Sequence, residues 1–229
     1  MGKLYIVATP IGNLQDISLR ATKVLQAVEA IACEDTRKTG LLLSQILPTD
    51  ANKPRLVSYY EQNELQRIPE IINALKNGLN IALVSDAGTP TVSDPGFKLV
   101  RECIREEIRV ESIPGPSSVI TALTVSGLPT DKFLFMGYPP RKPGHRKSLF
   151  ENVKSTMGFV KSTIIFFEAP HRIVKTLEEL RETFGDIDIV IARELTKVYE
   201  EVRREKISQS IAHFEKVVPK GEFAILMHP

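Results

Sequence analysis

Cysteine, net charge and long apolar runs are all scarce in this chain. Its 229 residues include only two cysteines, Cys33 and Cys103, and carry a formal net charge of +2. Two cysteines without a signal-like start favour buried thiols in a reducing cytosol over a disulfide framework. The small charge excludes a polycation, so any nucleic-acid binding must come from a local patch. Because no apolar run is long enough to cross a bilayer, we expect a cytoplasmic protein with no membrane partner.

Two phosphate-binding signatures are also missing. The first predicted strand, residues 4–8, runs into Thr9-Pro10-Ile11-Gly12-Asn13, which is not a GxGxxG loop, and the chain has no Walker loop. The missing GxGxxG loop excludes a Rossmann-type dinucleotide site at this position, and the missing Walker loop excludes the P-loop nucleoside triphosphatases. With 42% hydrophobic and 25% charged residues, the chain is globular and fits one large domain or two ordinary ones.

A long polar loop organises the first half of the chain. Residues 84–96 follow an apolar run that predicts a buried strand, and they precede a helical pattern at 97–104. In open α/β sheets, ligands bind at the carboxyl ends of the strands. The loop carries two glycines, two prolines and two aspartates, a composition suited to a rigid, polar cradle, although each of these is also an ordinary turn residue.

Three more loops follow predicted strands at the same edge. They are residues 9–13, 34–40 and 114–118, and together they predict a shared cleft. In the second of them, Glu34, Asp35 and Arg37 could orient a substrate. They could equally be an acidic helix cap with solvated charges, and the spacing leaves both interpretations open.

The overall pattern predicts two α/β halves, the first mostly parallel and the second mixed. Pro-Gly-Pro at 114–116 marks a sharp corner, so we expect domains at 1–115 and 116–229. A first helix is expected from Leu14 to about Val28, capped by Asp16 or Ser18. Later helices are expected from Ser148 and from Ala169-Pro170.

The densest basic segment is residues 138–147. Its prolines predict an extended loop in which Arg141, Lys142, Arg146 and Lys147 contact nucleic-acid phosphates and Tyr138 could stack on a base. A solvated basic turn is the competing interpretation. His171 and Arg172 are expected at a helix start, where backbone amides favour anions, so we predict that they too contact nucleic-acid phosphates or the cofactor.

Six ordered motifs together resemble the tetrapyrrole-methylase-like (class III) S-adenosylmethionine methyltransferases over nearly the whole chain. They lie at residues 7–14, 33–37, 84–96, 114–118, 167–172 and 192–197. Within that family the chain resembles the branch that methylates the ribose 2′-hydroxyl of a decoding-centre cytidine in 16S rRNA. It differs from the porphyrinoid enzymes in having Ser85-Asp86-Ala87 where many of them have Gly-Asp-Pro.

The resemblance implies a metal-free homodimer of two-domain subunits that acts on 16S rRNA or the small ribosomal subunit, with S-adenosylmethionine in the interdomain cleft. It implies that the cofactor is bound by Thr9, Pro10, Gly12, Asn13, Ser85, Asp86, Ala87, Gly88, Ser117, Ser118, Phe167 and Arg193. Family members often have a further helical tail beyond the position of Pro229.

Methyl transfer to a ribose hydroxyl needs positioning and a proton acceptor. Glu34, Asp35, Asp86 and Asp94 are candidate acceptors, and we favour the Glu34, Asp35 and Arg37 cluster as catalytic. Two alternatives stay open at this point: a methyltransferase of the same fold acting on a porphyrinoid-like small molecule, and a non-catalytic RNA-binding assembly factor.

Overall fold

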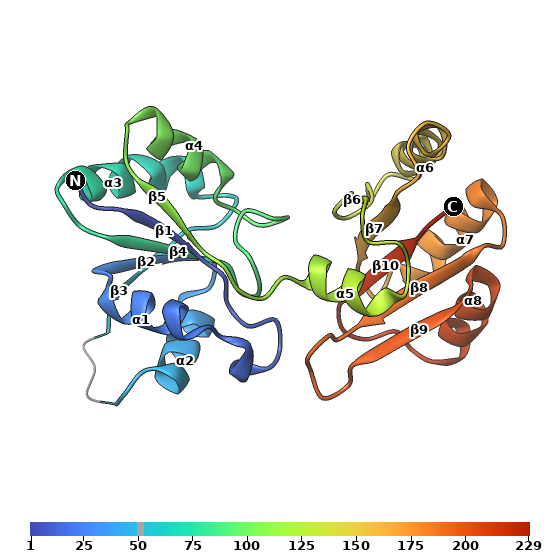
Figure 1. Cartoon of the computed structure of the whole chain (residues 1–229), viewed down its shortest axis with the longest axis horizontal. Helices are drawn as coiled ribbons and strands as arrows, with labels where there is room; N and C mark the ends of the chain where they lie inside the picture. Colours follow the sequence, from blue (N-terminus) through green and yellow to red (C-terminus); the bar gives the residue numbers. More distant parts are fainter. Residues whose placement is uncertain (50–52) are drawn as a thin grey trace. The chain divides into compact units, whose positions relative to one another are not determined.

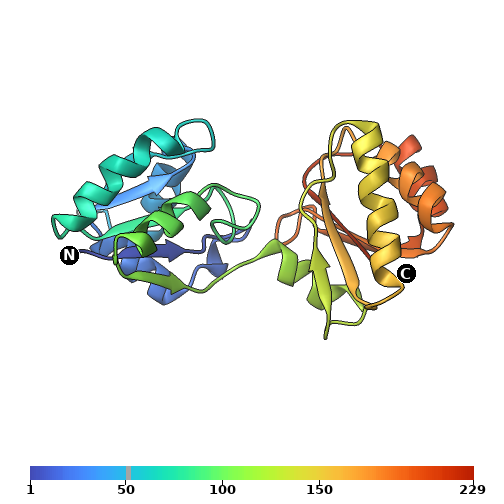
Figure 2. The same cartoon turned by 90° about the horizontal axis from the view of Figure 1, so that it is seen from above.

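The computed structural model describes residues 1–49 and 53–229, and the chain divides into two compact units, Met1–Ser117 and Ser118–Pro229. Each unit contains one five-stranded sheet with helices packed on it (Figures 1 and 2). Both cysteines are buried and free. None of the helices in the described ranges is long and apolar enough to span a bilayer.

The first unit is a parallel sheet in the order β3-β2-β4-β1-β5. Its elements in chain order are β1 (Leu4–Val7), η1 (Leu14–Asp16), α1 (Leu19–Ala27), β2 (Ala30–Cys33), α2 (Thr36–Ile46), β3 (Arg55–Ser58), α3 (Glu64–Lys76), β4 (Ile81–Val84), α4 (Phe97–Arg105) and β5 (Val110–Ile113). The predicted parallel sheet is confirmed. Every strand therefore ends at the same edge.

Alternation of side chains along the strands explains the three layers of this unit. In β4, Ile81 and Leu83 pack with α3 and α4, whereas Ala82 and Val84 pack with α1 and α2. Figure 1 shows these two helix pairs on opposite faces of the sheet. Strands buried on both faces are apolar throughout, as β2 and β4 are, and such strands are typical of parallel sheets.

The second unit is a mixed sheet in the order β6-β7-β10-β8-β9, in which only β6 and β7 pair in parallel. Its elements are α5 (Ser118–Ser126), β6 (Phe133–Phe135), α6 (Pro143–Met157), β7 (Thr163–Glu168), α7 (Ile173–Phe184), β8 (Asp188–Arg193), β9 (Glu201–Lys206), α8 (Ile207–Lys216) and β10 (Phe223–Met227). The predicted mixed sheet is confirmed. Its main core lies beneath α6, α7 and α8 and includes Phe150, Phe166 and Ile225.

Three predicted helix starts are wrong, although Ser18, one of the two predicted caps of the first helix, does cap it. The first α-helix begins only after Ser18, whose Oγ accepts a hydrogen bond from the backbone N–H of Ala21 at 3.0 Å; residues 14–16 form a separate 3-10 turn. Helix α6 begins at Pro143 rather than at Ser148, because a proline in the first turn has no N–H to lose and a φ that suits a helix. Helix α7 begins at Ile173, after the turn that contains Pro170.

Candidate active site

The carboxyl edge of the first sheet brings the predicted loops together. Cys33 at the end of β2 lies in register with Val84 at the end of β4, and Val7 at the end of β1 lies in register with Ile113 of β5. The segments that follow these four strands therefore start side by side. This is the edge at which open α/β sheets bind their ligands.

Two of these loops are joined by a pair of backbone hydrogen bonds. The N–H of Thr9 donates to the carbonyl of Gly88 at 2.9 Å, and the N–H of Gly88 donates to the carbonyl of Thr9 at 3.0 Å. The Thr9 hydroxyl also donates to the carbonyl of Ser85 at 3.3 Å. Gly88 has a φ of +86°, and a Cβ there would lie 3.3 Å from Ile11 Cγ2, so glycine suits this junction. The loops 9–13 and 85–88 thus form one rigid surface.

The third loop is fixed to the same surface. The hydroxyl of Thr89 donates to the carbonyl of Pro116 at 2.9 Å, and a Cβ on Gly115 would lie 3.1 Å from the Cβ of Ala8. Ser117 ends the first unit and Ser118 begins helix α5 of the second. Loops 9–13, 85–89 and 114–117 are therefore adjacent, as the sequence led us to expect.

The sequence-predicted residues on this surface differ in their exposure. Thr9, Pro10, Ser85 and Gly88 are buried and shape it from beneath, while Gly12, Asn13, Asp86 and Ala87 are exposed. A ligand on this surface would meet backbone groups, the small side chain of Ala87, and the polar side chains of Asn13 and Asp86.

The carboxylates near the carboxyl end of β2 make different contacts. Asp35 caps helix α2 by accepting from the backbone N–H of Arg37 at 2.9 Å, and it also pairs with the guanidinium of Arg37 at 2.8 Å. These hydrogen bonds from Arg37 hold the pKa of the Asp35 carboxyl well below its ordinary value. Asp86 pairs with Lys38 at 2.7 Å and accepts from the N–H of Asp35 at 3.2 Å. The helix-cap interpretation of Asp35 is confirmed.

Glu34 differs from Asp35 in that the pKa of its carboxyl is raised rather than lowered. Its carboxylate accepts a hydrogen bond from the N–H of Asp86 at 3.3 Å. Burial raises the pKa of this carboxyl above its ordinary value, and the nearby charge of Asp94 raises it further. Among the three catalytic candidates, Glu34 also lines a cavity.

That cavity has a volume of about 430 Å³ and lies entirely within the first unit. Three segments line it at the carboxyl ends of β2, β3 and β4: Glu34; Tyr60, Glu61, Gln62 and Glu64; and residues 93–98. The buried Glu64 accepts from the hydroxyl of Tyr59 at 3.2 Å and pairs with Lys98 at 2.5 Å. No motif marks residues 60–64 in the sequence; the signal that could have found them is their position directly after the predicted strand at 55–58.

Phe167 and Arg193 belong to the second unit. The ring of Phe167 packs edge-on against Phe135 and Tyr138, with centroids 4.8 and 5.7 Å apart. Arg193, at the end of β8, pairs with Glu201 of β9 at 3.2 Å.

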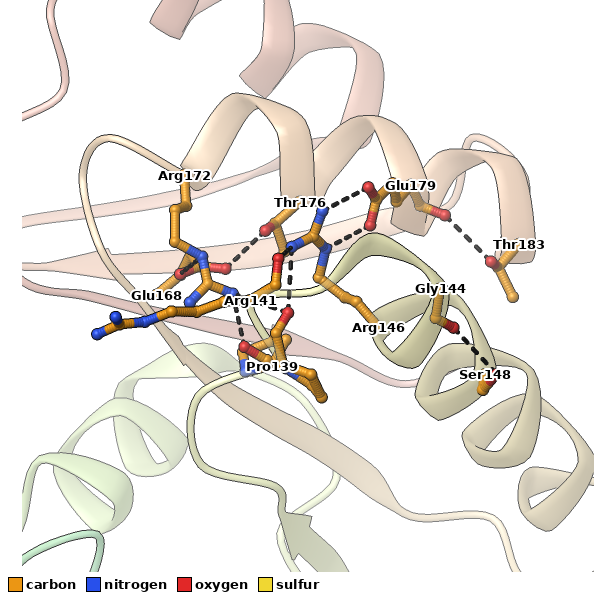
Figure 3. A network of polar contacts seen from close by, with 11 residues as sticks. Pro139, Arg141, Gly144, Arg146, Ser148, Glu168, Arg172, Thr176, Glu179 and Thr183 are labelled. Carbon is orange, nitrogen blue, oxygen red and sulfur yellow. Dashed lines mark hydrogen bonds and ion pairs between the residues drawn. The ribbon is translucent and has the colours of Figure 1, made fainter.

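The expected extended basic loop is wrong from residue 143 onward. Arg146 lies on helix α6 and is only 3% exposed. Its guanidinium pairs with both carboxylate oxygens of Glu179 on α7 and donates to the carbonyls of Pro140 and Arg141 (Figure 3). This network ties the start of α6 to α7, so Arg146 is structural and is not available to RNA.

Arg172 is part of the same arrangement. It donates to the carbonyl of Pro139 at 2.6 Å and lies 3.2 Å from the carboxylate of the buried Glu168, which also accepts from Thr176 (Figure 3). We therefore assign it a structural role rather than an RNA contact. Arg141, Lys142, Lys147 and His171 are exposed, and the Arg141 side chain extends away from the network.

Comparison with known proteins places the chain in a family. Residues 3–210 match the family described as Tetrapyrrole (Corrin/Porphyrin) Methylases. The chain belongs to the tetrapyrrole methylase family. Solved structures of this fold include uroporphyrin-III-C-methyltransferase from Thermus thermophilus, with a TM-score of 0.68, 20% identity, and coverage of 99% of this chain and 94% of that one. Cobalt precorrin-4 methyltransferase gives a TM-score of 0.69 at 18% identity, covering 98% and 94%.

Sequence relatives are much closer. The chain is 47% identical to a protein of Thermotoga maritima named ribosomal RNA small subunit methyltransferase I, over 99% of this chain and 98% of that protein. A protein of the same name from a Hydrogenobaculum species is 45% identical, over 98% and 95%. The resemblance inferred from the six motifs is confirmed. Over residues 1–49 and 53–229, no group of three or more side chains is arranged to hold a metal ion.

Proposed function

We propose that this protein is an S-adenosylmethionine-dependent methyltransferase that modifies the ribose 2′-hydroxyl of a cytidine in the decoding region of 16S rRNA. The observation that supports it most is the 45–47% identity, over nearly full length, to relatives named ribosomal RNA small subunit methyltransferase I. The joined loops at the carboxyl edge of the first sheet supply a matching site.

The residues of this edge fit the cofactor. Small and backbone groups at Gly12, Ala87 and Gly88 allow close approach, and a Cβ at Gly88 would crowd Ile11. A solved Thermus thermophilus uroporphyrin-III methyltransferase of the same fold was obtained with S-adenosylhomocysteine, with a TM-score of 0.66 at 18% identity over 98% of this chain and 97% of that one. We propose that residues 9–13, 85–88 and Ser117 of the first unit bind S-adenosylmethionine. When bound, the cofactor supplies an electrophilic methyl group on a sulfonium.

Glu34 is the proposed proton acceptor. A ribose hydroxyl must lose its proton as its oxygen is methylated, and a positioned carboxylate can take it. Asp35 is occupied by the α2 cap and Arg37, and Asp86 is occupied by Lys38. Glu34 lines the cavity and has a raised pKa, which makes it a better base than an ordinary carboxylate. Asp35 and Arg37 then position the start of α2, which directly follows Glu34.

The exposed side chains of Arg141, Lys142, Lys147 and His171 are the proposed RNA-docking group of the second unit. Phosphate contacts by such side chains release counterions, so the affinity would fall with salt. A triple Arg141→Ala, Lys142→Ala, Lys147→Ala variant is expected to bind small subunits more weakly and with a shallower salt slope. An unchanged slope would contradict this assignment. We also propose a homodimer in solution, which sedimentation velocity can test.

The central experiment measures transfer of a tritiated methyl group to small ribosomal subunits isolated from cells that lack this protein. We expect label on one cytidine ribose, located by resistance of the modified 2′-position to alkaline cleavage. Glu34→Gln should lower kcat by roughly 10²–10⁴-fold with little change in cofactor affinity measured by calorimetry. Label on a porphyrinoid but not on RNA, or cofactor binding without turnover, would refute the proposal.

The pH dependence of kcat gives an independent check on Glu34. The acceptor must be ionised, so activity is lost as the pH falls through its pKa. Because the pKa of Glu34 is raised, the acidic limb of the kcat profile should lie at a higher pH than it would with a glutamate of ordinary pKa. This limb should be absent in Glu34→Gln. An acidic limb that persists unchanged in the variant would assign the proton acceptor elsewhere.

A further inference from the structure

The cavity beside Glu34 has a lining of mixed chemistry. Two aromatic side chains are exposed there, Tyr60 at 40% and Phe97 at 60%. The lining also includes the cation of Lys98, the carboxylates of Glu34, Glu61, Glu64 and Asp94, and residues Gln62, Ser93, Pro95 and Gly96. Exposed aromatic rings next to polar groups are typical of sites that take an unstacked base from a nucleic acid.

The size of the cavity suits a single nucleoside. Its volume of about 430 Å³ lies in the lower part of the range for small-molecule pockets, about 300–1,000 Å³. The 2′-hydroxyls of A-form RNA are displayed in its shallow minor groove, so reaching the sugar requires no unstacking; an enzyme that also reads the base edge has to take the base out of its stack, and a pocket must then receive it. Since Glu34 lines this cavity, a nucleoside inside it would have its sugar near the proposed proton acceptor.

One carboxylate of the lining is left for a ligand. Glu34 is bonded to the N–H of Asp86, and Glu64 to Tyr59 and Lys98; Asp94 also has a partner. Within the described part of the chain, Glu61 makes no hydrogen bond or ion pair. It follows Tyr60 directly in the turn before α3. A carboxylate accepts from the N4 amino group of cytosine and repels the O4 oxygen that uracil has at the same place.

We propose that this cavity binds the target cytidine of the RNA, with Tyr60 and Phe97 packing against the base and Glu61 accepting a hydrogen bond from its N4 amino group. The proposal rests on the function proposed above and adds how the base is chosen. In this proposal Lys98, which pairs with Glu64 at 2.5 Å, donates to the O2 or N3 acceptor of the same base.

The test compares kcat/KM for methyl transfer to reconstituted small subunits that carry either cytidine or uridine at the modified position. The unchanged protein should prefer cytidine, and Glu61→Gln should reduce that preference by roughly tenfold, because an amide can donate to O4 as well as accept from N4. Glu107→Gln is the matched control, since Glu107 is exposed and precedes β5 at the opposite edge of the sheet. Tyr60→Ala and Phe97→Ala should raise KM for RNA, and Tyr60→Phe should retain it.

The outcomes separate the two proposals. No methyl transfer to either RNA by the unchanged protein would overturn the proposed function and the cytidine site with it. Transfer to RNA with a cytidine preference that is the same in Glu61→Gln and the unchanged protein would overturn the cytidine site alone. Calorimetry with S-adenosylmethionine should give equal affinities for all these variants. A loss of cofactor affinity in Glu61→Gln would also overturn the assignment.

Discussion

Replacing Arg146 by alanine should destabilise the second unit strongly. The Arg146 side chain is 3% exposed and that of Glu179 is 17% exposed, and the guanidinium also satisfies the carbonyls of Pro140 and Arg141. Breaking a buried pair by removing one partner costs about 3–5 kcal/mol, because the other charge stays buried and unpaired. Glu179 retains some access to water, so we expect a loss of about 2–4 kcal/mol.

The assay is urea unfolding followed by circular dichroism, with Lys147→Ala as the matched control. Lys147 is the next residue on the same helix and is exposed, so its removal should change the stability by less than about 0.5 kcal/mol. The double variant Arg146→Ala, Glu179→Ala should cost less than the sum of the single changes, because it leaves no uncompensated charge.

The affinity for RNA distinguishes a structural role of Arg146 from the RNA contact that was expected from the sequence. Under conditions where Arg146→Ala is fully folded, its affinity for small subunits should match that of the unchanged protein, whereas Lys147→Ala should bind more weakly. If Arg146→Ala kept its stability and instead lost RNA affinity, the reasoning from burial would be refuted.

Three further predictions concern the first unit. Gly88→Val should weaken S-adenosylmethionine binding at least tenfold by calorimetry, since the position has a φ of +86° and lies against Ile11; equal affinity would argue against the loop as a cofactor site. Ser18→Ala should lower the free energy of unfolding by about 1 kcal/mol through loss of the α1 cap, and a variant as stable as the parent would dispute that cap. Burial raises the pKa of the Cys103 thiol to about 12, so this thiol should react with Ellman's reagent only after unfolding; rapid reaction in the native protein would contradict it.

The loops of the candidate site could be predicted from the sequence because they follow strongly apolar strands. A buried parallel strand such as β4 is apolar throughout, and the polar residues after Val84 mark its carboxyl end. Parallel pairing then brings residues 9–13, 85–89 and 114–117 to one edge without further information. The order of the strands was not needed for this inference, only their direction.

The role of Arg146 could not be predicted, because its partner lies 33 residues away on another helix. Within the segment 141–147, all four basic residues look alike, and the prolines suggest an extended chain. Pro143 instead occupies the first turn of α6, so the helical period turns Arg146 inward and leaves Lys147 outward. The cavity was missed for a similar reason. Tyr60 and Glu61 lie near Glu34 only because β3 pairs with β2.

Hydrogen bonds determine which of the acidic residues at the carboxyl edge of the first sheet can act as a base. Asp35 cannot both cap α2 and accept a proton from substrate, because its low pKa makes it a poor base. Its carboxylate instead fixes the corner at which β2 becomes α2, and Glu34 sits immediately before that corner. Asp35 and Glu34 therefore have different roles. The Asp35 carboxylate is stabilised as an ion and holds the backbone, whereas the Glu34 carboxylate is partly desolvated and faces the cavity. Asp35→Asn should accordingly affect the stability of the protein and the position of Glu34 more than it affects cofactor binding. The acidic limb of the kcat profile should remain in Asp35→Asn, whereas Glu34→Gln removes it.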